Sequence, residues 1–387
     1  MKASLQPVGA GVVAALVGFA SSFAVVLAGL EAVGASQTQA ASGLLALCVT
    51  QALGILWLTW RHRTPLMLAW STPGAALLVS SGAVDGGWPA AVGAFLVVGV
   101  LVLLTALWPV LGDLIAAIPT PIAQAMLAGV LLSICLEPVK VFADQPGLVA
   151  PILLVWVLLL RFARRLAVPG AFVATMVVIG FYLADHGAPH LHLAPHVSWT
   201  EPSFDVQALI GLAIPLYVVT MASQNVPGVA VLSTFGFKVP WRETMTVTGL
   251  GTLAGATAGG HAINLAAITA AMVASPEADP EPGRRWIAAN AGGWAYLVLA
   301  AVSTGLVAVV AAAPDGLIEV VAGLALLGTL GAALKGATGA DEGREAAVVT
   351  FVVAASSVSF GRIGAAFWAL VAGLLVHVVV GRGGSQP

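Results

Sequence analysis

Long apolar runs separated by short polar links dominate the chain, and this pattern predicts helices that cross a membrane. A helix needs about 20 apolar residues to span a bilayer. Twelve runs approach or exceed this length and lie near residues 8–30, 40–60, 89–108, 113–136, 147–162, 166–184, 204–224, 243–258, 286–312, 316–335, 345–360 and 362–380. The links between them are too short to hold a separate soluble domain.

Two further apolar segments, near residues 67–82 and 259–275, are too short and too interrupted to cross as ordinary helices. Paired segments of this kind, at corresponding places in two halves of a chain, are typical of half-helices at the substrate site of a secondary transporter. The candidate site residues within them are Ser71, Thr72, Pro73 and Gly74 in the first segment and Gly260, His261 and Asn264 in the second.

With these two segments the chain has 14 predicted membrane elements, seven before the 185–205 loop and seven after it. An odd number of elements turns the second half upside down relative to the first. Residues 73–78 also align with residues 264–269 at a spacing of 191 positions. The sequence therefore predicts an all-α polytopic membrane protein of two inverted seven-helix repeats. Elements 3 and 10 are each expected to be an extended stretch followed by a half-helix.

The basic residues predict the orientation, because Lys and Arg are enriched in cytoplasmic loops. With a cytoplasmic N-terminus, 13 of the 15 basic residues fall inside, and only Lys140 and Arg362 fall outside. The 13 are Lys2, Arg61, Arg63, Arg161, Arg164, Arg165, Lys238, Arg242, Arg284, Arg285, Lys335, Arg344 and Arg382. We therefore expect a multi-pass protein of the inner (cytoplasmic) membrane with both termini in the cytoplasm.

Composition narrows the function classes. Hydrophobic residues make up 59% of the chain and charged residues 8%, with a mean hydropathy of +1.01, and these values exclude a soluble protein. The net charge of −2, without a run of Lys or Arg, gives no basis for binding nucleic acid. No His-Glu-x-x-His motif, serine–base pair or intramembrane carboxylate dyad points to an enzyme. Neither a cofactor nor a metal is expected.

Three groups of residues are interpreted without a functional role. Cys48 and Cys135 each stand alone in an apolar run and are expected to be buried thiols. The 185–205 loop is interpreted as a solvated segment rather than a metal site, although it holds His186, His190, His192 and His196. A cytoplasmic loop with its basic anchor is predicted from Glu277, Asp279, Glu281, Arg284 and Arg285.

The first interrupted segment has the chemistry of a helix start. Ser71 or Thr72 supplies a hydroxyl N-cap, and Pro73 follows at the first helical position, where its missing N–H costs nothing. Asn264 is an equally good cap in the second segment. Two facing N-termini would present free N–H groups and partial positive charge, which favours an anion such as a carboxylate. The alternative is two kinked helices whose glycines serve close packing.

His261 is the only ionisable side chain predicted deep in the membrane, where such groups are costly and are therefore functional candidates. Imidazole titrates near ~6.5 in water, and a neighbouring anion strengthens its hold on the proton, so His261 is a candidate for proton coupling. The alternative is a neutral, hydrogen-bonded core histidine. Gln224 and Asn225, just before Pro227, are candidates for lining a polar cavity, with helix packing as the alternative.

Four segments resemble the bacterial benzoate:proton symporters, and the resemblance runs over essentially the whole chain. They are STPGAAL at 71–77, IPxPIAxAMLAG at 118–129, QNxPG at 224–228 and GGHAxNLAAI at 259–268. The resemblance implies the 14-helix inverted-repeat fold that uracil permeases and anion exchangers share. In that fold a core domain, here about 8–108 and 203–312, carries the substrate past a gate domain, here about 113–184 and 315–380. It also implies a homodimer formed through the gate domain.

Together these features predict proton-coupled uptake of benzoate or a related aromatic carboxylate across the bacterial inner membrane, by elevator-type alternating access. The carboxylate is expected at the helix starts and the ring against apolar side chains such as Trp70 or Phe23. The predicted substrate-binding residues are Ser71, Thr72, Pro73, Gly74, Gln224, Asn225, Gly260, His261 and Asn264, and His261 is also the predicted proton site.

Two other kinds of transport are kept as alternatives. The first is a nucleobase or other organic-anion:proton symporter of the same fold. The resemblance disfavours a nucleobase, because positions similar to Gln224 and His261 hold glutamates in the nucleobase permeases. The second is a channel, and the absence from the sequence of a charged ring or a filter-like carbonyl motif disfavours it.

Overall fold

The computed structural model of the chain describes residues 5–108, 110–111, 114, 117–187, 194–339, 343–361 and 363–383. The elements before residue 190 are α1 (Gln6–Ala20), α2 (Phe23–Ala32), α3 (Gln37–His62), β1 (Leu68–Trp70), α4 (Thr72–Ser81), α5 (Gly87–Leu107), α7 (Thr120–Asp144), α8 (Pro146–Phe162), the 3-10 turn η1 (Arg164–Leu166) and α9 (Ala167–His186).

The second half begins with a long helix that changes type along its length. It comprises α10 (Val206–Ala208), the π-helical η2 (Leu209–Ala213), α11 (Ile214–Thr220), the π-helical η3 (Met221–Asn225) and α12 (Val226–Thr234). The remaining elements are α13 (Trp241–Ala256), β2 (Ile263–Leu265), α14 (Ile268–Ala274), the 3-10 turn η4 (Pro282–Arg284), α15 (Trp286–Ala311), α16 (Leu317–Thr338), α17 (Arg344–Ala355) and α18 (Ala365–Gly383).

Eight helical stretches in the described residues are long and apolar enough to cross a membrane. They are Gln6–Ala32, Gln37–His62, Gly87–Leu107, Thr120–Asp144, Ala167–His186, Val206–Thr234, Pro282–Ala311 and Leu317–Thr338. Pro146–Phe162 and Ala365–Val380 are apolar but shorter. The protein is therefore a mostly helical, polytopic membrane protein, as the apolar runs predict.

Two predicted spans end elsewhere in the structure. The span expected at 113–136 is α7, which begins only at Thr120, after Pro119, and continues to Asp144. The span expected at 204–224 continues to Thr234, because η3 keeps the chain helical up to Pro227, which lies in the first turn of α12. The Gln224–Asn225 pair therefore lies inside a long helix and not at its end.

The two interrupted segments lie against each other as a short antiparallel pair of strands. Their register pairs Leu68 with Leu265, Ala69 with Asn264 and Trp70 with Ile263. Two more backbone bonds extend the pairing, from the Ala266 N–H to the Met67 carbonyl (2.9 Å) and from the Ser71 N–H to the Ala262 carbonyl (3.0 Å). Extended backbone in an apolar bundle must satisfy its polar groups internally, and this pairing does so.

The second half-helix starts later than the sequence predicts. Asn264, the predicted cap, lies in β2, and α14 begins at Ile268 with no side-chain cap. The strand pairing holds the chain extended as far as Leu265, so a helix cannot begin at Asn264. The two strands start at Leu68 and Ile263, 195 positions apart, and the half-helices after them start at Thr72 and Ile268, 196 positions apart.

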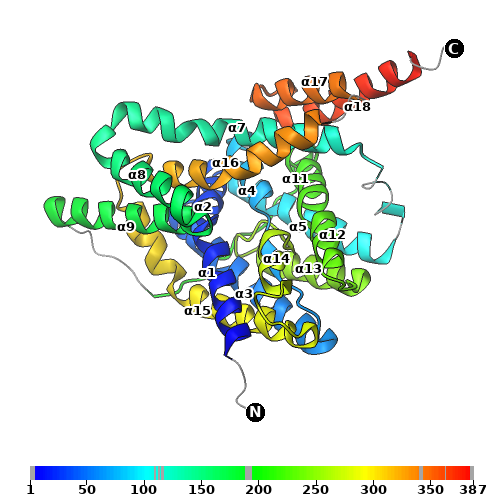
Figure 1. The fold of residues 1–387 in the computed structure, drawn as a ribbon. Coiled ribbons are helices and arrows are strands. Elements are labelled where there is room, and N and C mark those ends of the chain that lie inside the picture. Colours follow the sequence, from blue (N-terminus) through cyan, green and yellow to red (C-terminus); the bar gives the residue numbers. More distant parts are fainter. Residues whose placement is uncertain are drawn as a thin grey trace.

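The helices pack in two sets (Figure 1). In one set, α15 packs against α1 and α3, and α13 packs against α3 and α5. The paired strands lie in this set, where β1 contacts α3 and β2 contacts α13. In the other set, α7 runs beside α16 and α17, and α8 runs beside α9. Cys48 and Cys135 are buried free thiols, as predicted.

Candidate functional site

The start of α4 is a capped helix N-terminus. Ser71 Oγ accepts a hydrogen bond from the Gly74 N–H at 3.1 Å, so Ser71 and not Thr72 is the cap. The helix begins at Thr72, which places Pro73 second rather than first, still within the turn whose N–H groups have no helical partner. Gly74 permits a close approach, because a Cβ there would lie 2.5 Å from Leu216 Cδ1 and 2.7 Å from Ser71 Oγ.

We call the two interrupted segments, 67–82 and 259–275, the first and second crossovers. His261 lies on the second crossover and ties it to the start of α4. Its Nε2 lies 3.0 Å from the carbonyl oxygen of Ser71, and a carbonyl only accepts, so Nε2 carries the hydrogen. In the neutral ring Nδ1 is then unprotonated, and this atom is buried without a partner in the described structure. The side chain is fully buried, and the ring of Phe95 lies edge-on at a centroid distance of 6.3 Å.

A glycine turn brings His261 to this position. Gly259 has φ +98°, a conformation that side chains rarely adopt, and a Cβ there would lie 3.1 Å from the indole of Trp88. Gly260 is buried, and its N–H donates to the Gly255 carbonyl at 2.9 Å. Gly260 therefore shapes the turn before His261 through its backbone.

Asn225 holds the second crossover in place. Its amide oxygen accepts from the Leu265 N–H at 2.8 Å, and its Nδ2 lies 3.1 Å from Met221 Sδ. Two residues earlier in the strand, the Ile263 N–H donates to Thr252 Oγ1 of α13 at 3.1 Å. Both bonds satisfy N–H groups of β2, so two helices fix the strand that carries Asn264.

Gln224, in the π-helical segment η3, and Thr220, the last residue of α11, make different contacts. π-helical turns are frequent at functional sites, because they shift side chains out of the regular helical register. Gln224 is partly exposed, and its side-chain amide makes no hydrogen bond among the described residues. Thr220, one turn earlier, has its Oγ1 2.7 Å from Ser71 Oγ. Thr220 was absent from the predicted site, although its spacing from Gln224 puts both on one helix face.

The first span is interrupted near β1. The hydroxyls of Ser21 and Ser22 donate to the Gly18 carbonyl at 3.1 and 2.9 Å, and α1 ends at Ala20. Such side-chain bonds compete with the backbone ladder and bend or break a helix. Trp70 Nε1 donates to Ser22 Oγ at 2.8 Å, so the break is fastened to the residue just before the α4 cap.

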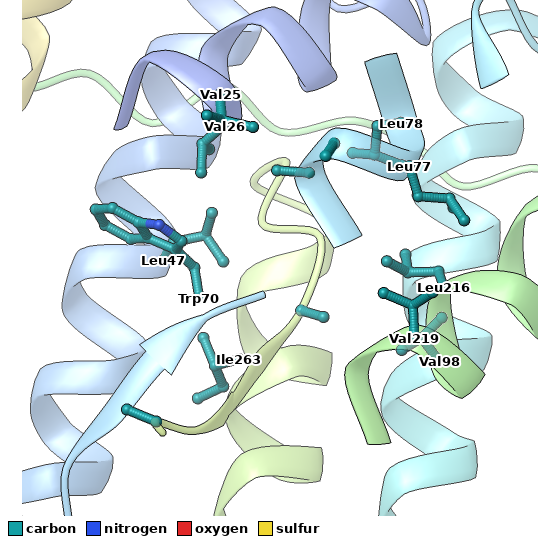
Figure 2. Packing of buried hydrophobic residues seen from close by; sticks show 14 of the residues in the cluster. Val25, Val26, Leu47, Trp70, Leu77, Leu78, Val98, Leu216, Val219 and Ile263 are labelled. Atoms are coloured by element: carbon teal, nitrogen blue, oxygen red, sulfur yellow. The ribbon is translucent and has the colours of Figure 1, made fainter. Parts of the chain in front are cut away.

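Aromatic rings lie beside this break. Phe19 and Trp70 meet edge-on at a centroid distance of 5.6 Å, and Trp70 meets Tyr296 of α15 edge-on at 6.1 Å. Phe23, one turn after Phe19, stacks on it at 5.5 Å. All four side chains are buried. Figure 2 shows Trp70 at the end of β1 among aliphatic side chains such as Val26 and Leu47.

Four buried polar atoms on the crossovers and on η3 have no partner within the described residues. They are His261 Nδ1, Asn264 Oδ1, Ser223 Oγ and Thr269 Oγ1. An unpaired buried polar atom costs about 1–3 kcal/mol, so such atoms need an explanation, and a ligand is one. Ser223 and Thr269 were not predicted, although Ser223 adjoins Gln224 and Thr269 lies in the aligned segment 264–269. Together with the α4 start, these atoms mark the candidate site.

The sequence predicts a loop with a basic anchor after α14, and Arg285 in this loop also caps the helix. Arg285 is only 5% exposed and donates to the carbonyls of Ala274 (2.9 Å), Asp279 (2.7 Å) and Pro280 (3.4 Å). Ala274 is the last residue of α14, so the guanidinium satisfies a carbonyl that the helix end leaves open. Two consecutive arginines after a short helix give no sequence signal for this capping role.

The remaining features lie away from the candidate site. A cavity of about 230 Å³ lies near the other end of α4 and is lined by residues that include Ser81, Asp85, Gln207 and Ser359, but by none of the predicted site residues. No group of three or more metal-binding side chains occurs in the part of the chain that the structure describes. Lys2, Arg362, His190 and His192 lie outside that part.

Comparison with known proteins identifies the family. The family model described as benzoate membrane transport protein matches residues 1–379. The chain belongs to the benzoate membrane transport protein family. The Inner membrane protein YdcO of Escherichia coli (strain K12) is 37% identical, over 96% of this chain and 95% of that protein. A Benzoate membrane transport protein of Acinetobacter baylyi is 28% identical, over 97% of this chain and 95% of that protein.

The fold of this family member is similar to solved anion transporters. The transmembrane domain of a cyanobacterium bicarbonate transporter, BicA, aligns with a TM-score of 0.60 at 13% identity and covers 98% of both chains. The murine Solute Carrier 26 family member A9 anion transporter in the inward-facing state aligns with a TM-score of 0.65 at 12% identity, over 100% of this chain and 69% of that one. At these identities the likeness concerns the fold alone. Family and fold together make this benzoate-transport family member a membrane transporter, a class whose members are normally not enzymes.

Proposed function

We propose that the protein is a secondary active transporter that takes up benzoate or a related aromatic carboxylate together with protons. The observation that carries the proposal is the capped start of α4, where Ser71 contacts both Thr220 and His261. A helix start favours a negative charge, and the aromatic rings beside it suit a planar ring. The name of the Acinetobacter baylyi relative supports benzoate as the substrate.

In this proposal the carboxylate binds at the start of α4. The backbone of Thr72, Pro73 and Gly74 gives the positive end of the helix dipole, and the amide of Gln224 adds a donor. The unpaired hydroxyls of Ser223 and Thr269 supply further donors. Three predicted site residues act through the backbone of the second crossover. Asn225 holds this backbone, and Gly260 and Asn264 are part of it.

The coupled proton binds at Nδ1 of His261. The resulting imidazolium keeps its Nε2 bond to the Ser71 carbonyl and adds a positive charge beside the bound carboxylate. Burying the imidazolium alone or the carboxylate alone would cost free energy, because each charge would lose its hydration. When both are buried together and are well hydrogen-bonded, their attraction offsets this cost. Anion and proton therefore bind together, which is the requirement for symport.

The proposal extends to the whole chain as a 14-element inverted repeat. The helices of about 8–108 and 203–312 form the core domain that carries the substrate, and those of about 113–184 and 315–380 form the gate domain. The packing of the helices supports this division. One set contains α3, α5, α13 and α15, and the other contains α7, α16 and α17. The core moves past the gate in an elevator-type cycle, in a gate-linked homodimer in the bacterial inner membrane with both termini in the cytoplasm.

The test is uptake of labelled benzoate into proteoliposomes, with and without an inward proton gradient. We expect saturable uptake that rises above the external concentration only with the gradient and stops when a protonophore dissipates it. Saturable uptake that never exceeds equilibrium would contradict proton coupling, and flux that does not saturate would favour a channel. Uptake of uracil in place of benzoate would favour the nucleobase alternative.

A further inference from the structure

One face of α3 changes from apolar to aromatic to cationic toward the end of the helix. Its residues are spaced by four, three and one positions, which keeps them on one side of a helix, and they are Leu53, Trp57, Trp60 and Arg61. All four are exposed, at 55% for Leu53, 50% for Trp57 and 61% for Trp60. The span that α3 forms ends at His62, so the last turn of this face lies near the membrane surface.

Helix α13 carries a similar gradient beside α3. Arg242, in its first turn, and Leu250, about two turns later, are exposed and lie on one face. A hydrogen bond of 3.2 Å from Trp57 Nε1 to Glu243 Oε1 joins the two helices at this level. Arg242 directly precedes Glu243, and Arg61 follows Trp57 by about one turn. Both arginines therefore lie close to this bond along their own helices.

Arg61 and Arg242 form no ion pair among the residues that the structure describes. This cluster contains the acid Glu243, but Trp57 binds its Oε1, and its Oε2 lies 2.7 Å from His62 Nε2. The two guanidinium groups therefore remain available to an anion. Their fork of N–H donors matches the geometry of phosphate oxygens.

We propose that this face of α3 and α13 binds the headgroup of an anionic phospholipid. Arg61 and Arg242 hold its phosphate. The rings of Trp57 and Trp60 meet at a centroid distance of 5.6 Å and lie at headgroup level, where tryptophan is enriched in membrane proteins. The acyl chains lie along the exposed leucines of the two helices. The inference does not rest on the proposed function, because no transported substrate enters it.

Charge and apolar surface together select this occupant. Two positive charges without acidic partners favour a headgroup of net negative charge over a zwitterionic one, whose own cation they repel. The aromatic and apolar side chains that continue from the arginines favour a lipid over a soluble anion, because only a lipid has chains to cover them. The basic residues of the sequence predict this end of the helices to be cytoplasmic, and the anionic lipids of the cytoplasmic leaflet attract Lys and Arg.

The experiment adds short-chain phosphatidylglycerol, which carries one negative charge, to the purified full-length protein in neutral detergent and measures the melting temperature. A ligand that binds only the folded protein raises this temperature, and its dependence on lipid concentration gives an apparent Kd. We expect phosphatidylglycerol to raise the melting temperature more than phosphatidylcholine with the same chains does. Arg61→Gln and Arg242→Gln should each raise the apparent Kd for phosphatidylglycerol about fivefold.

The matched control is Lys335→Gln. It removes one exposed positive charge from the last turn of α16, which lies outside this face, and should keep the Kd of the wild type. Because the two arginines are exposed, their variants should fold, and melting temperatures without lipid that equal the wild-type value would show this.

Four results would overturn the inference. Wild-type protein that both lipids stabilise equally would show that the face does not select charge. Arginine variants with the Kd of the wild type would place the lipid elsewhere. Inorganic phosphate that raises the melting temperature as much as phosphatidylglycerol would identify a soluble anion as the occupant. Wild-type protein that is dimeric in neutral detergent, with a monomeric Trp60→Arg variant, would assign the face to a second copy of the chain.

Discussion

The ring of His261 donates a hydrogen bond to the carbonyl oxygen of Ser71 at 3.0 Å, and Ser71 caps α4. A side chain from the second interrupted segment is thus bonded to the residue that starts the half-helix of the first, 190 positions away. A change in the protonation of His261 reaches the start of α4 through one hydrogen bond. This link is the structural reason for placing anion and proton at one site.

Replacing His261 with glutamine tests the proton site. The variant keeps a hydrogen-bond donor for the Ser71 carbonyl but has no group that titrates. We expect uptake driven by a pH gradient to be lost, whereas benzoate binding weakens by less than about tenfold. The measurement is transport against external pH for both proteins, reconstituted in equal amounts. Wild-type uptake should fall as external pH rises.

The opposite result for His261→Gln is equally informative. A purely structural histidine predicts lower expression or thermal stability with the pH dependence of the remaining transport preserved. An unchanged pH profile would remove His261 from the mechanism and leave protonation of the substrate itself as the source of coupling.

Removing the cap of α4 tests the anion site. Loss of an N-cap hydroxyl costs about 1 kcal/mol, so Ser71→Ala should raise the KM for benzoate by about 3- to 10-fold. Ser71→Thr, which keeps a hydroxyl, should restore most of the affinity. The control is Ser80→Ala near the other end of α4, where the hydroxyl donates to the Leu77 carbonyl at 3.0 Å. An equal rise in KM in both alanine variants would contradict a specific role for the helix start.

Gln224 is expected to act on the substrate and not on the fold. Its amide has no hydrogen bond within the described residues, so Gln224→Ala should leave the melting temperature unchanged and raise the KM for benzoate. The rise should stay within about tenfold, because water can take the place of the lost amide. The measurement is the KM for benzoate uptake together with the melting temperature of the same variant. Unchanged kinetics would place Gln224 among the packing residues.

Asn225, the next residue, should show the reverse pattern. Asn225→Ala leaves the Leu265 N–H without its acceptor, and an unpaired buried donor costs about 1–3 kcal/mol. We expect a melting temperature several degrees below that of Gln224→Ala, measured in the same detergent. Equal melting temperatures for the wild type and Asn225→Ala would show that the hydrogen bond from the Leu265 N–H to Asn225 does not stabilise the protein.

Local sequence chemistry predicted the first half-helix better than the second. Ser71 followed by Thr72 and Pro73 carries a start signal within three residues, and the helix forms there. Asn264 carries a start signal of similar quality, but its neighbours pair with β1 and keep it extended. The competing partner lies 195 positions away in sequence, so no local pattern could reveal it.

The sequence by itself determined the membrane class, most of the helical spans, the two interrupted segments and the first helix cap. These features depend on apolar run length and on side chains within a few residues of each other, which a single sequence displays directly. Only the tertiary structure decided that the two segments pair as strands and that α14 starts at Ile268. It also decided that Asn225 and Arg285 hold the second crossover and its half-helix. These features are hydrogen bonds to backbone groups, and backbone groups carry no sequence signature, so their partners emerge only when the chain is folded.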